Sequence, residues 1–177
     1  METRITGKVI VLGNNIDTDQ IYPGRFLEIT DPKEIGKRCL SGVSPEIAEK
    51  FQKGDIIVAG TNFGCGSSRE HAAIAIINMG ASVVLADSFA RIFFRNSINL
   101  GLPLITCKGI SSKVKDGQLI ELDIEAGELT VKETGEILKT DKLGDYAMSI
   151  LEAGGIKPLM REKMRKLRER NKAHLDK

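Results

Sequence analysis

Three short aliphatic segments recur at near-regular intervals in the middle of the chain, at 55–60, 82–86 and 102–106. The stretches between them, 72–79 and 88–94, are long enough to form crossover helices. A strand–helix–strand–helix–strand order favours right-handed crossovers, and therefore parallel pairing of the three strands. The pattern predicts an α/β fold, and it excludes an all-helical or an all-antiparallel chain.

The two flanks of this unit have a different pattern. Residues 4–12 are predicted to form one further strand, and 118–134 alternates with period two on either side of Ala126-Gly127, which indicates an antiparallel hairpin. We therefore expect a mixed sheet with flanking helices. Other helices are expected from Asp31 and from Ser44, at 146–151 before Gly154, and at 158–172; Ser88 is expected to cap the helix at 88–94.

The positive charge is concentrated at one end of the chain. The 177 residues carry a net charge of +2 and a pI near 8.4, but most of the excess lies in 157–177, and the rest of the chain is slightly acidic. Aromatic residues make up 5% and Trp is absent, so platforms for stacking bases are not expected. We expect no nucleic-acid partner. The basic tail is interpreted as a solvated helix, with subunit contact as the alternative.

The cysteines and the apolar runs bear on the cellular compartment. Cys39, Cys65 and Cys107 lie far apart and form no Cys-x-x-Cys pair, which suits a reducing environment. Packing is the favoured role of Cys65, over a reactive thiol or a metal ligand. No apolar run approaches membrane-spanning length, and no signal-peptide pattern follows Met1. The expected location is the cytoplasm, with no membrane contact.

The segment 62–72, Asn-Phe-Gly-Cys-Gly-Ser-Ser-Arg-Glu-His-Ala, is the strongest candidate for a functional site. Gly64 and Gly66 predict a tight bend after a strand, and two serines and an arginine then stand where a helix is expected to open. Backbone N–H groups and the positive end of a helix dipole attract anions at such a point. Arginine adds a planar fork for a carboxylate. The segment indicates a site for an acidic small molecule.

Several residues near this site have a structural as well as a functional interpretation. Glu70 would complete a capping box with Ser67, which a catalytic role does not exclude. A hydroxyl in this field has its alkoxide favoured, so it could act as base or nucleophile. His71 faces another side of the helix and is more simply structural. Asp17 and Asp19 are interpreted as turn residues that accept backbone N–H bonds, rather than as a Ca²⁺ loop.

These motifs together resemble one family. The matching residues are Gly7, Gly13, Asp17-Thr18-Asp19, the segment 23–27, the whole of 62–72 and Ser88-Phe89-Ala90-Arg91-Ile92-Phe93. They resemble the small subunit of 3-isopropylmalate dehydratase and its relatives, which correspond to the swivelling fourth domain of aconitase. The resemblance implies a β/β/α swivelling domain over 1–159, followed by a basic helical tail over 160–177.

The resemblance also implies a function that needs a second chain. This chain would bind no metal, and a large catalytic subunit would carry the [4Fe–4S] cluster. The family reaction moves the hydroxyl of a hydroxy diacid to the neighbouring carbon by dehydration and rehydration, here between 2- and 3-isopropylmalate in leucine biosynthesis. Small subunits of homoaconitase and of 2,3-dimethylmalate dehydratase are the alternatives within the class. A non-catalytic anion-binding module is the alternative outside it.

The resemblance assigns roles to individual residues. Ser67 matches the catalytic serine, whose alkoxide removes a carbon-bound proton, and Ser68 and Arg69 match the groups that bind a substrate carboxylate. Asp19, Gly64 and Gly66 support the site. The segment formed by Arg25, Phe26, Leu27, Glu28 and Ile29 matches the substrate-specificity loop. Arg25 is also expected to bind the substrate, and it lies close enough to Glu28 to neutralise it.

Glu28 departs from the family pattern. Homoaconitase-type chains place an arginine there, whereas isopropylmalate-type chains place an apolar residue. A glutamate would repel a distal carboxylate unless Arg25 neutralised it, which argues against homocitrate-like substrates. Ile29 is a candidate contact for an isopropyl group.

Overall fold

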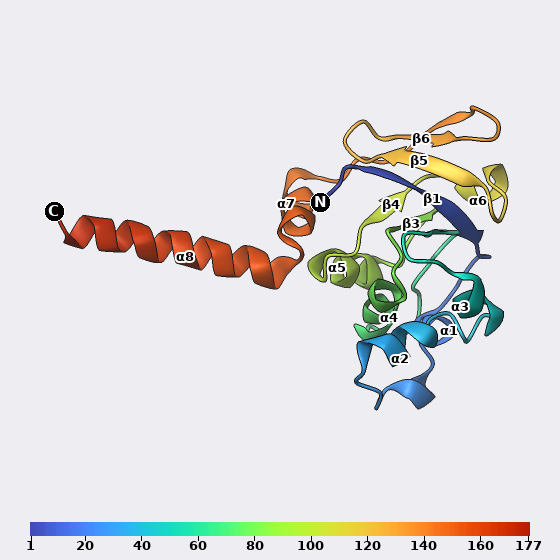
Figure 1. Cartoon of the computed structure of the whole chain (residues 1–177), viewed down its shortest axis with the longest axis horizontal. Helices are drawn as coiled ribbons and strands as arrows, with labels where there is room; N and C mark the ends of the chain where they lie inside the picture. Colours follow the sequence, from blue (N-terminus) through green and yellow to red (C-terminus); the bar gives the residue numbers. More distant parts are fainter.

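The computed structural model describes residues 1–177 and contains one seven-stranded sheet, in the order β4-β3-β2-β1-β5-β6-β7 (Figure 1). Its edges are short strands, and β1 lies at the centre. The strands are β1 (Arg4–Val11), β2 (Ile56–Ala59), β3 (Val83–Ala86), β4 (Leu104–Thr106), β5 (Leu119–Asp123), β6 (Glu128–Val131) and β7 (Ile137–Lys139).

The parallel half confirms the order expected from the three aliphatic segments. Strands β1 to β4 pair in parallel, with Val9 opposite Ile56 in one pair and Ile57 opposite Val84 in the next. Every residue of β2 and of β3 is buried. Continuous aliphatic runs form such strands because helices or other strands cover both faces of a parallel sheet.

The antiparallel half confirms the hairpin and adds one strand. Strand β5 pairs with β1 and β6, and β6 pairs with β7, all antiparallel. The alternating burial of β5 and β6 matches the period-two pattern from which they were predicted. Strand β7, which was not expected, has only three residues, and its side chains at Ile137 and Lys139 are exposed. A strand that contributes one buried residue leaves no periodic signal.

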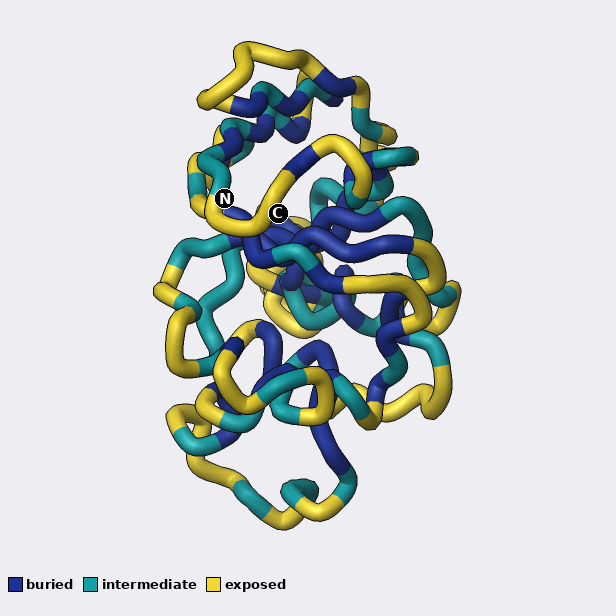
Figure 2. Tube along the Cα trace, turned by 90° about the vertical axis from the view of Figure 1, so that its right-hand side faces the viewer, coloured by how far each residue is buried: buried dark blue, intermediate teal, exposed yellow.

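The helices and the curled sheet enclose two hydrophobic cores. One core is built from Ile57, Ala59 and the apolar faces of the helices below the sheet in Figure 1, and the other lies between the sheet, its antiparallel end and α6. Figure 2 shows the buried segments gathered through the middle of the molecule. The helices are α1 (Thr18–Ile21), the 3-10 turn η1 (Gly24–Phe26), α2 (Pro32–Lys37), α3 (Glu46–Lys50), α4 (His71–Met79), α5 (Arg91–Asn99), α6 (Ile110–Lys113), α7 (Asp145–Ala153) and α8 (Ile156–Leu175). No helix has both the length and the apolar composition that a membrane crossing requires.

Two predicted helix caps are wrong. Helix α4 begins at His71, with Glu70 as its N-cap residue and no side-chain cap, so Ser67 and Glu70 form no capping box. Helix α5 begins at Arg91 with Ala90 as N-cap, and Ser88 does not cap it. In both cases the serine hydroxyl accepts a hydrogen bond within or from the 62–72 loop instead of capping the helix. Such a contact cannot be predicted from the neighbouring residues alone.

The last helix, α8, projects away from the body (Figure 1). Its 20 residues include none that is buried, and only Ile156 and Leu159 near its start pack against the core. The predicted division at 159/160 falls inside this helix, after its last core contact. We retain the division into a swivelling domain and a basic tail as a proposal.

Candidate active site at the 62–72 loop

The loop that follows β2 turns sharply, because three of its residues have left-handed backbone conformations. The φ angles of Asn62, Gly64 and Gly66 are +60°, +85° and +98°. A side chain at Gly64 would overlap the ring of Phe93, so this position needs glycine for space as well as for φ. The prediction of a glycine bend at this point is confirmed.

Backbone hydrogen bonds hold the loop beside the end of β1. The N–H of Gly64 donates to the carbonyl of Ile16 at 2.8 Å, and the N–H of Thr18 donates to the carbonyl of Cys65 at 2.8 Å. The loop also forms an isolated bridge with Phe89, beyond the end of β3. It therefore continues the sheet past the carboxyl ends of β1, β2 and β3, which is where open α/β sheets bind ligands.

Two polar side chains hold the loop, and neither was predicted to belong to the site. Ser88 Oγ accepts a 2.8 Å hydrogen bond from the N–H of Asn62, which explains why Ser88 does not cap α5. Asn96, on α5, donates from Nδ2 to the carbonyl of Ser68 at 3.1 Å. The stretch 88–93 was part of the family match, but Asn96 lies outside it. No local signal connects Asn96 with a loop 28 residues earlier in the chain.

Ser67 and Arg69 contact each other directly. Arg69 Nε–H donates to Ser67 Oγ at 3.1 Å, and both residues are exposed, as is Ser68. A guanidinium that donates to a hydroxyl stabilises the deprotonated form of that hydroxyl. The terminal nitrogens of Arg69 form none of the ion pairs of the structure. They are therefore free to bind a carboxylate.

Asp17 and Asp19 are turn residues, as expected. Asp17 Oδ1 accepts from the N–H of Gln20 at 2.7 Å and forms a capping box at the start of α1. Asp19 Oδ1 accepts from the N–H of Gly24 at 2.9 Å. Gly24 lies beside the loop, since a Cβ built on it would be 3.6 Å from Arg69 Nη1. Asp19 therefore holds Gly24, which directly precedes the predicted specificity segment, close to Arg69.

The predicted specificity segment, 25–29, is brought to the loop mainly through Leu27. Leu27, Arg69 and His71 line a shared crevice of about 10 Å³. The guanidinium of Arg25 instead lies over the ring of Phe26, with Cζ 4.5 Å from the ring centroid. Of the predicted segment, Leu27 is thus the residue that lines the same crevice as Arg69.

The remaining members of this segment point in different directions. Glu28 is exposed, and neither it nor Arg25 takes part in an ion pair, so Arg25 does not neutralise Glu28 in this structure. Ile29 is partly buried against the core below the sheet. The segment is held by Tyr22, whose hydroxyl donates to the carbonyl of Phe26 at 2.7 Å.

His71 lies against an aromatic ring. Its imidazole stacks on Tyr22, with centroids 6.5 Å apart and planes 10° from parallel. Burial raises the pKa of Tyr22, and its phenol donates to the carbonyl of Phe26. This packing supports the structural interpretation of His71.

The cysteines do not form a metal site. Cys39 and Cys107 are buried in different cores, Cys65 is partly exposed in the loop, and all three are free thiols. Burial raises the pKa of both core thiols, to about 11 for Cys107, where the nearby carboxylate of Asp87 adds to the effect. The structure contains no cluster of three or more His, Cys, Asp or Glu side chains suited to a metal ion. These residues do not fit an iron–sulfur cluster, which requires grouped thiolates.

Comparison with known proteins identifies the class to which this fold and loop belong. The Aconitase C-terminal domain family matches residues 7–108, which is more than half of the chain, and the chain belongs to this family. It is 52% identical to the isopropylmalate/citramalate isomerase small subunit of Methanocaldococcus jannaschii, over 93% of this chain and 98% of that protein. It is 51% identical to 3-isopropylmalate dehydratase small subunit 1 of Methanopyrus kandleri, over 91% and 95% of the two chains.

A solved structure agrees with these relatives. The crystal structure of 3-isopropylmalate dehydratase from Methanocaldococcus jannaschii matches with a TM-score of 0.88 and 41% identity, over 96% of this chain and 99% of that one. The expected family and the expected mixed α/β swivelling fold are both confirmed. The names of the relatives describe small subunits, which implies a large-subunit partner.

Proposed function

We propose that this chain is the small subunit of a hydro-lyase of the 3-isopropylmalate dehydratase type, which interconverts 2- and 3-isopropylmalate in leucine biosynthesis. The observation that carries the proposal is the contact between Arg69 Nε and Ser67 Oγ on an exposed loop. It joins a potential base to a free carboxylate-binding group, in a family whose named relatives act on isopropylmalate.

Ser67 is the proposed base. Its alkoxide takes a proton from the substrate carbon, the electron pair of that C–H bond forms the alkene, and the hydroxyl leaves the neighbouring carbon. The hydroxyl leaves as hydroxide; hydroxide then adds to the carbon that lost the proton while Ser67 returns its proton to the other carbon, so the hydroxyl moves by one carbon. Arg69 stabilises the alkoxide through Nε and holds a substrate carboxylate through its terminal nitrogens, with Ser68 beside it.

The second half of the active site is proposed to lie on the large subunit. Ser67, Ser68 and Arg69 are all exposed, so they form an open surface rather than an enclosed pocket. The cysteines here do not fit a [4Fe–4S] cluster, so we assign the cluster to the large subunit. We also propose that the protein works in the cytoplasm, where a reducing environment keeps Cys39, Cys65 and Cys107 as thiols.

The choice of substrate is proposed to depend on Leu27 and Glu28. Leu27 lies in the crevice with Arg69, so it is better placed than Ile29 to contact an apolar substituent on a bound diacid. Glu28 is exposed and unpaired, and it repels a third carboxylate. This favours isopropylmalate over the tricarboxylic substrate of homoaconitase. Citramalate, named for the Methanocaldococcus relative, has a smaller apolar group and remains compatible with Leu27.

Anaerobic reconstitution with the cognate large subunit tests the proposal. The substrate panel contains 3-isopropylmalate, citramalate, 2,3-dimethylmalate and homocitrate, and we expect the highest kcat/KM for 3-isopropylmalate. Glu28→Arg should raise activity on homocitrate relative to wild type. A complex that forms but dehydrates no 2-hydroxy diacid would support the non-catalytic anion-binding alternative and refute the enzyme proposal.

A further inference from the structure

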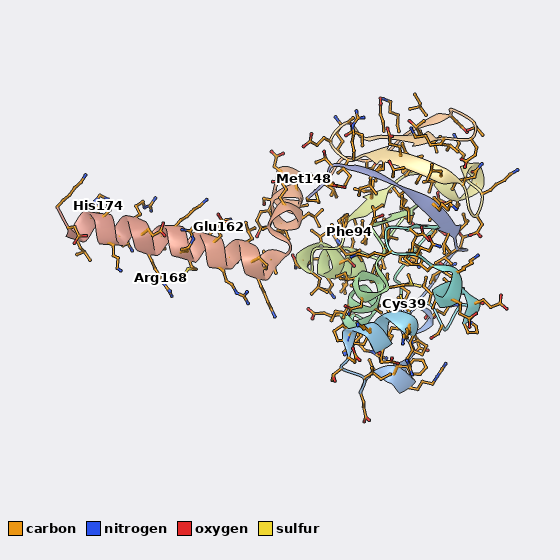
Figure 3. All side chains as sticks on the ribbon, viewed as in Figure 1. Cys39, Phe94, Met148, Glu162, Arg168 and His174 are labelled. Atoms are coloured by element: carbon orange, nitrogen blue, oxygen red, sulfur yellow. The ribbon has the colours of Figure 1, made fainter.

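Helix α8 carries two parallel rows of side chains that the proposed chemistry does not use. One row is apolar and exposed: Met160, Met164 and Leu167 have exposed fractions of 41%, 50% and 43%. Their spacing of four and then three residues places them on one side of a helix. The adjacent row is mainly cationic, and it consists of Lys157, Arg161, Arg165, Arg168 and Lys172, of which Arg165 is paired with Glu169 at 2.7 Å. Figure 3 shows Arg168 and Glu162 on the part of α8 that stands clear of the body.

The root of α8 continues the apolar row into a hollow on the body. A cavity of about 640 Å³ lies where α5, α7 and α8 meet, and its apolar lining includes Phe94, Ile98 and Tyr146. Met160 lines both this hollow and the outer face of α8. Arg91 and Arg95 also line the hollow. The hollow and the two rows thus form one surface, the α8 face, which is apolar along its length and bordered by cations.

Charge decides which kind of occupant suits the α8 face. Helix α8 carries eight Lys or Arg and two Glu, Glu162 and Glu169. Pairing it with a second copy would bring two cationic rows together, which is unfavourable. The apolar row is narrow and has no aromatic residue, unlike helices that lie in a lipid interface. Nucleic acid would leave the apolar row without a use. An acidic, helical protein surface satisfies both rows.

We propose that the α8 face docks an acidic helical surface of the large subunit, an inference that rests on the proposed function. Residues spaced four and three apart pack against a partner helix, and methionine side chains adapt to an irregular partner. The cationic row pairs with carboxylates around that contact. Most of this electrostatic gain appears as faster association and as sensitivity to salt.

Helix α5 connects the α8 face to the active-site loop. This helix contributes Arg91, Arg95 and Phe94 to the hollow and Asn96 to the hydrogen bond with the carbonyl of Ser68. A partner seated in the hollow therefore packs on the helix that holds the loop. The face strengthens assembly without supplying a group to the reaction.

Two charge-reversed variants test the proposal. Arg161→Glu/Arg168→Glu changes the cationic row, whereas Lys166→Glu/Arg170→Glu makes the same change in net charge about half a turn away. We expect the first variant to raise the Kd for the large subunit at least tenfold and the second to raise it less than threefold. The difference should shrink as salt is raised from 50 to about 500 mM. With saturating large subunit, kcat should equal that of wild type for both variants.

A third variant separates packing from charge, and circular dichroism on each protein verifies that α8 is still helical. Met164→Gln should raise the Kd about three- to tenfold with little dependence on salt. Equal effects of the two charge variants, or no effect of either, would overturn the docking proposal. A second result would also overturn it. In that result the wild-type chain self-associates or binds RNA, Arg161→Glu/Arg168→Glu loses this property, and the affinity for the large subunit is unchanged. A complex that assembles tightly but is inactive counts against the proposed function. The docking proposal is then still tested by comparing the Kd values of the two charge variants for the large subunit.

Discussion

Arg69 donates its Nε–H to Ser67 Oγ at 3.1 Å, across two residues of an exposed loop. The contact uses only one edge of the guanidinium, so the other edge can bind a carboxylate while the first stabilises an alkoxide. In the proposed mechanism, a single arginine therefore couples substrate binding to the basicity of the serine. This coupling requires that Ser67 stay outside helix α4, because a serine engaged as a helix cap would offer its oxygen to backbone N–H groups instead.

Replacing Ser67 by alanine should abolish turnover and leave assembly intact. The variant loses the proposed base, and a positioned base contributes on the order of 10²–10⁴-fold to rate. We expect kcat to fall by about 10³-fold or more in the reconstituted enzyme, with the Kd for the large subunit unchanged. Ser68→Ala is the control and should affect mainly KM. A Ser67→Ala enzyme with near-normal kcat would remove Ser67 from the mechanism.

Replacing Arg69 by lysine should weaken both functions of this residue. Lysine has no Nε–H at the position that contacts Ser67 and no planar fork for a carboxylate. We expect kcat/KM to fall by about 10- to 100-fold, which corresponds to about 1.4–2.8 kcal/mol. The pH at which activity rises should also move upward, because the alkoxide loses a stabilising donor. Steady-state kinetics over a pH series measures both effects, and an unchanged KM and pH profile would contradict this role.

Gly64→Ala should destabilise the fold at the active-site loop. The new methyl group would overlap the ring of Phe93, in a backbone conformation with φ near +85°. We expect a loss of about 2–4 kcal/mol in the free energy of unfolding, measured by urea denaturation. Gly109→Ala is the matched control, since its φ is +81° but nothing lies within 4 Å of the added Cβ. Equal losses in the two variants would show that backbone strain alone determines the cost.

Asp116 should make the stability of the chain dependent on acid. Partial burial of the Asp116 carboxylate raises its pKa. Hydrogen bonds from the Val11 N–H and from Lys50 Nζ, together with the charge of Lys50, outweigh this effect and hold the pKa of Asp116 below the usual value of 3.8. The stabilisation is therefore present above about pH 4 and lost as the pH falls further. Asp116→Asn should cost about 1 kcal/mol at pH 7 and converge with wild type near pH 2–3, as measured by denaturation across pH. A constant difference across this range would exclude the ionic contribution.

The three thiols should react at very different rates. Cys39 and Cys107 are buried, and burial raises the pKa of both, so few thiolates form at pH 8. We expect one thiol, Cys65, to react quickly with a disulfide reagent in the native protein and three to react in denaturant. Cys65→Ala should remove the fast phase. Rapid reaction of two or more thiols without denaturant would show that a core opens readily.

The parallel strands and the hairpin could be predicted from the chain because their signal is periodic. Buried aliphatic runs such as Ile56–Ala59 and alternating ones such as Leu119–Asp123 follow directly from which faces each strand buries. Strand β7 has one buried residue and no such period. The caps of α4 and α5 were predicted wrongly because Ser67 and Ser88 have good capping chemistry, but their oxygens contact Arg69 and Asn62 instead.

The glycine bend and the candidate anion site of the loop could be predicted from local chemistry, because glycine conformations and arginine–carboxylate geometry are properties of short segments. The family was identified from the resemblance of the sequence motifs. The tertiary structure decided which distant groups meet. It placed Leu27 rather than Arg25 in the crevice that Arg69 lines, and it brought Asn96 to the carbonyl of Ser68. It also left the apolar row of α8 exposed beside its cations. Such contacts depend on how helices pack around the sheet, and long-range packing has no signature within a segment.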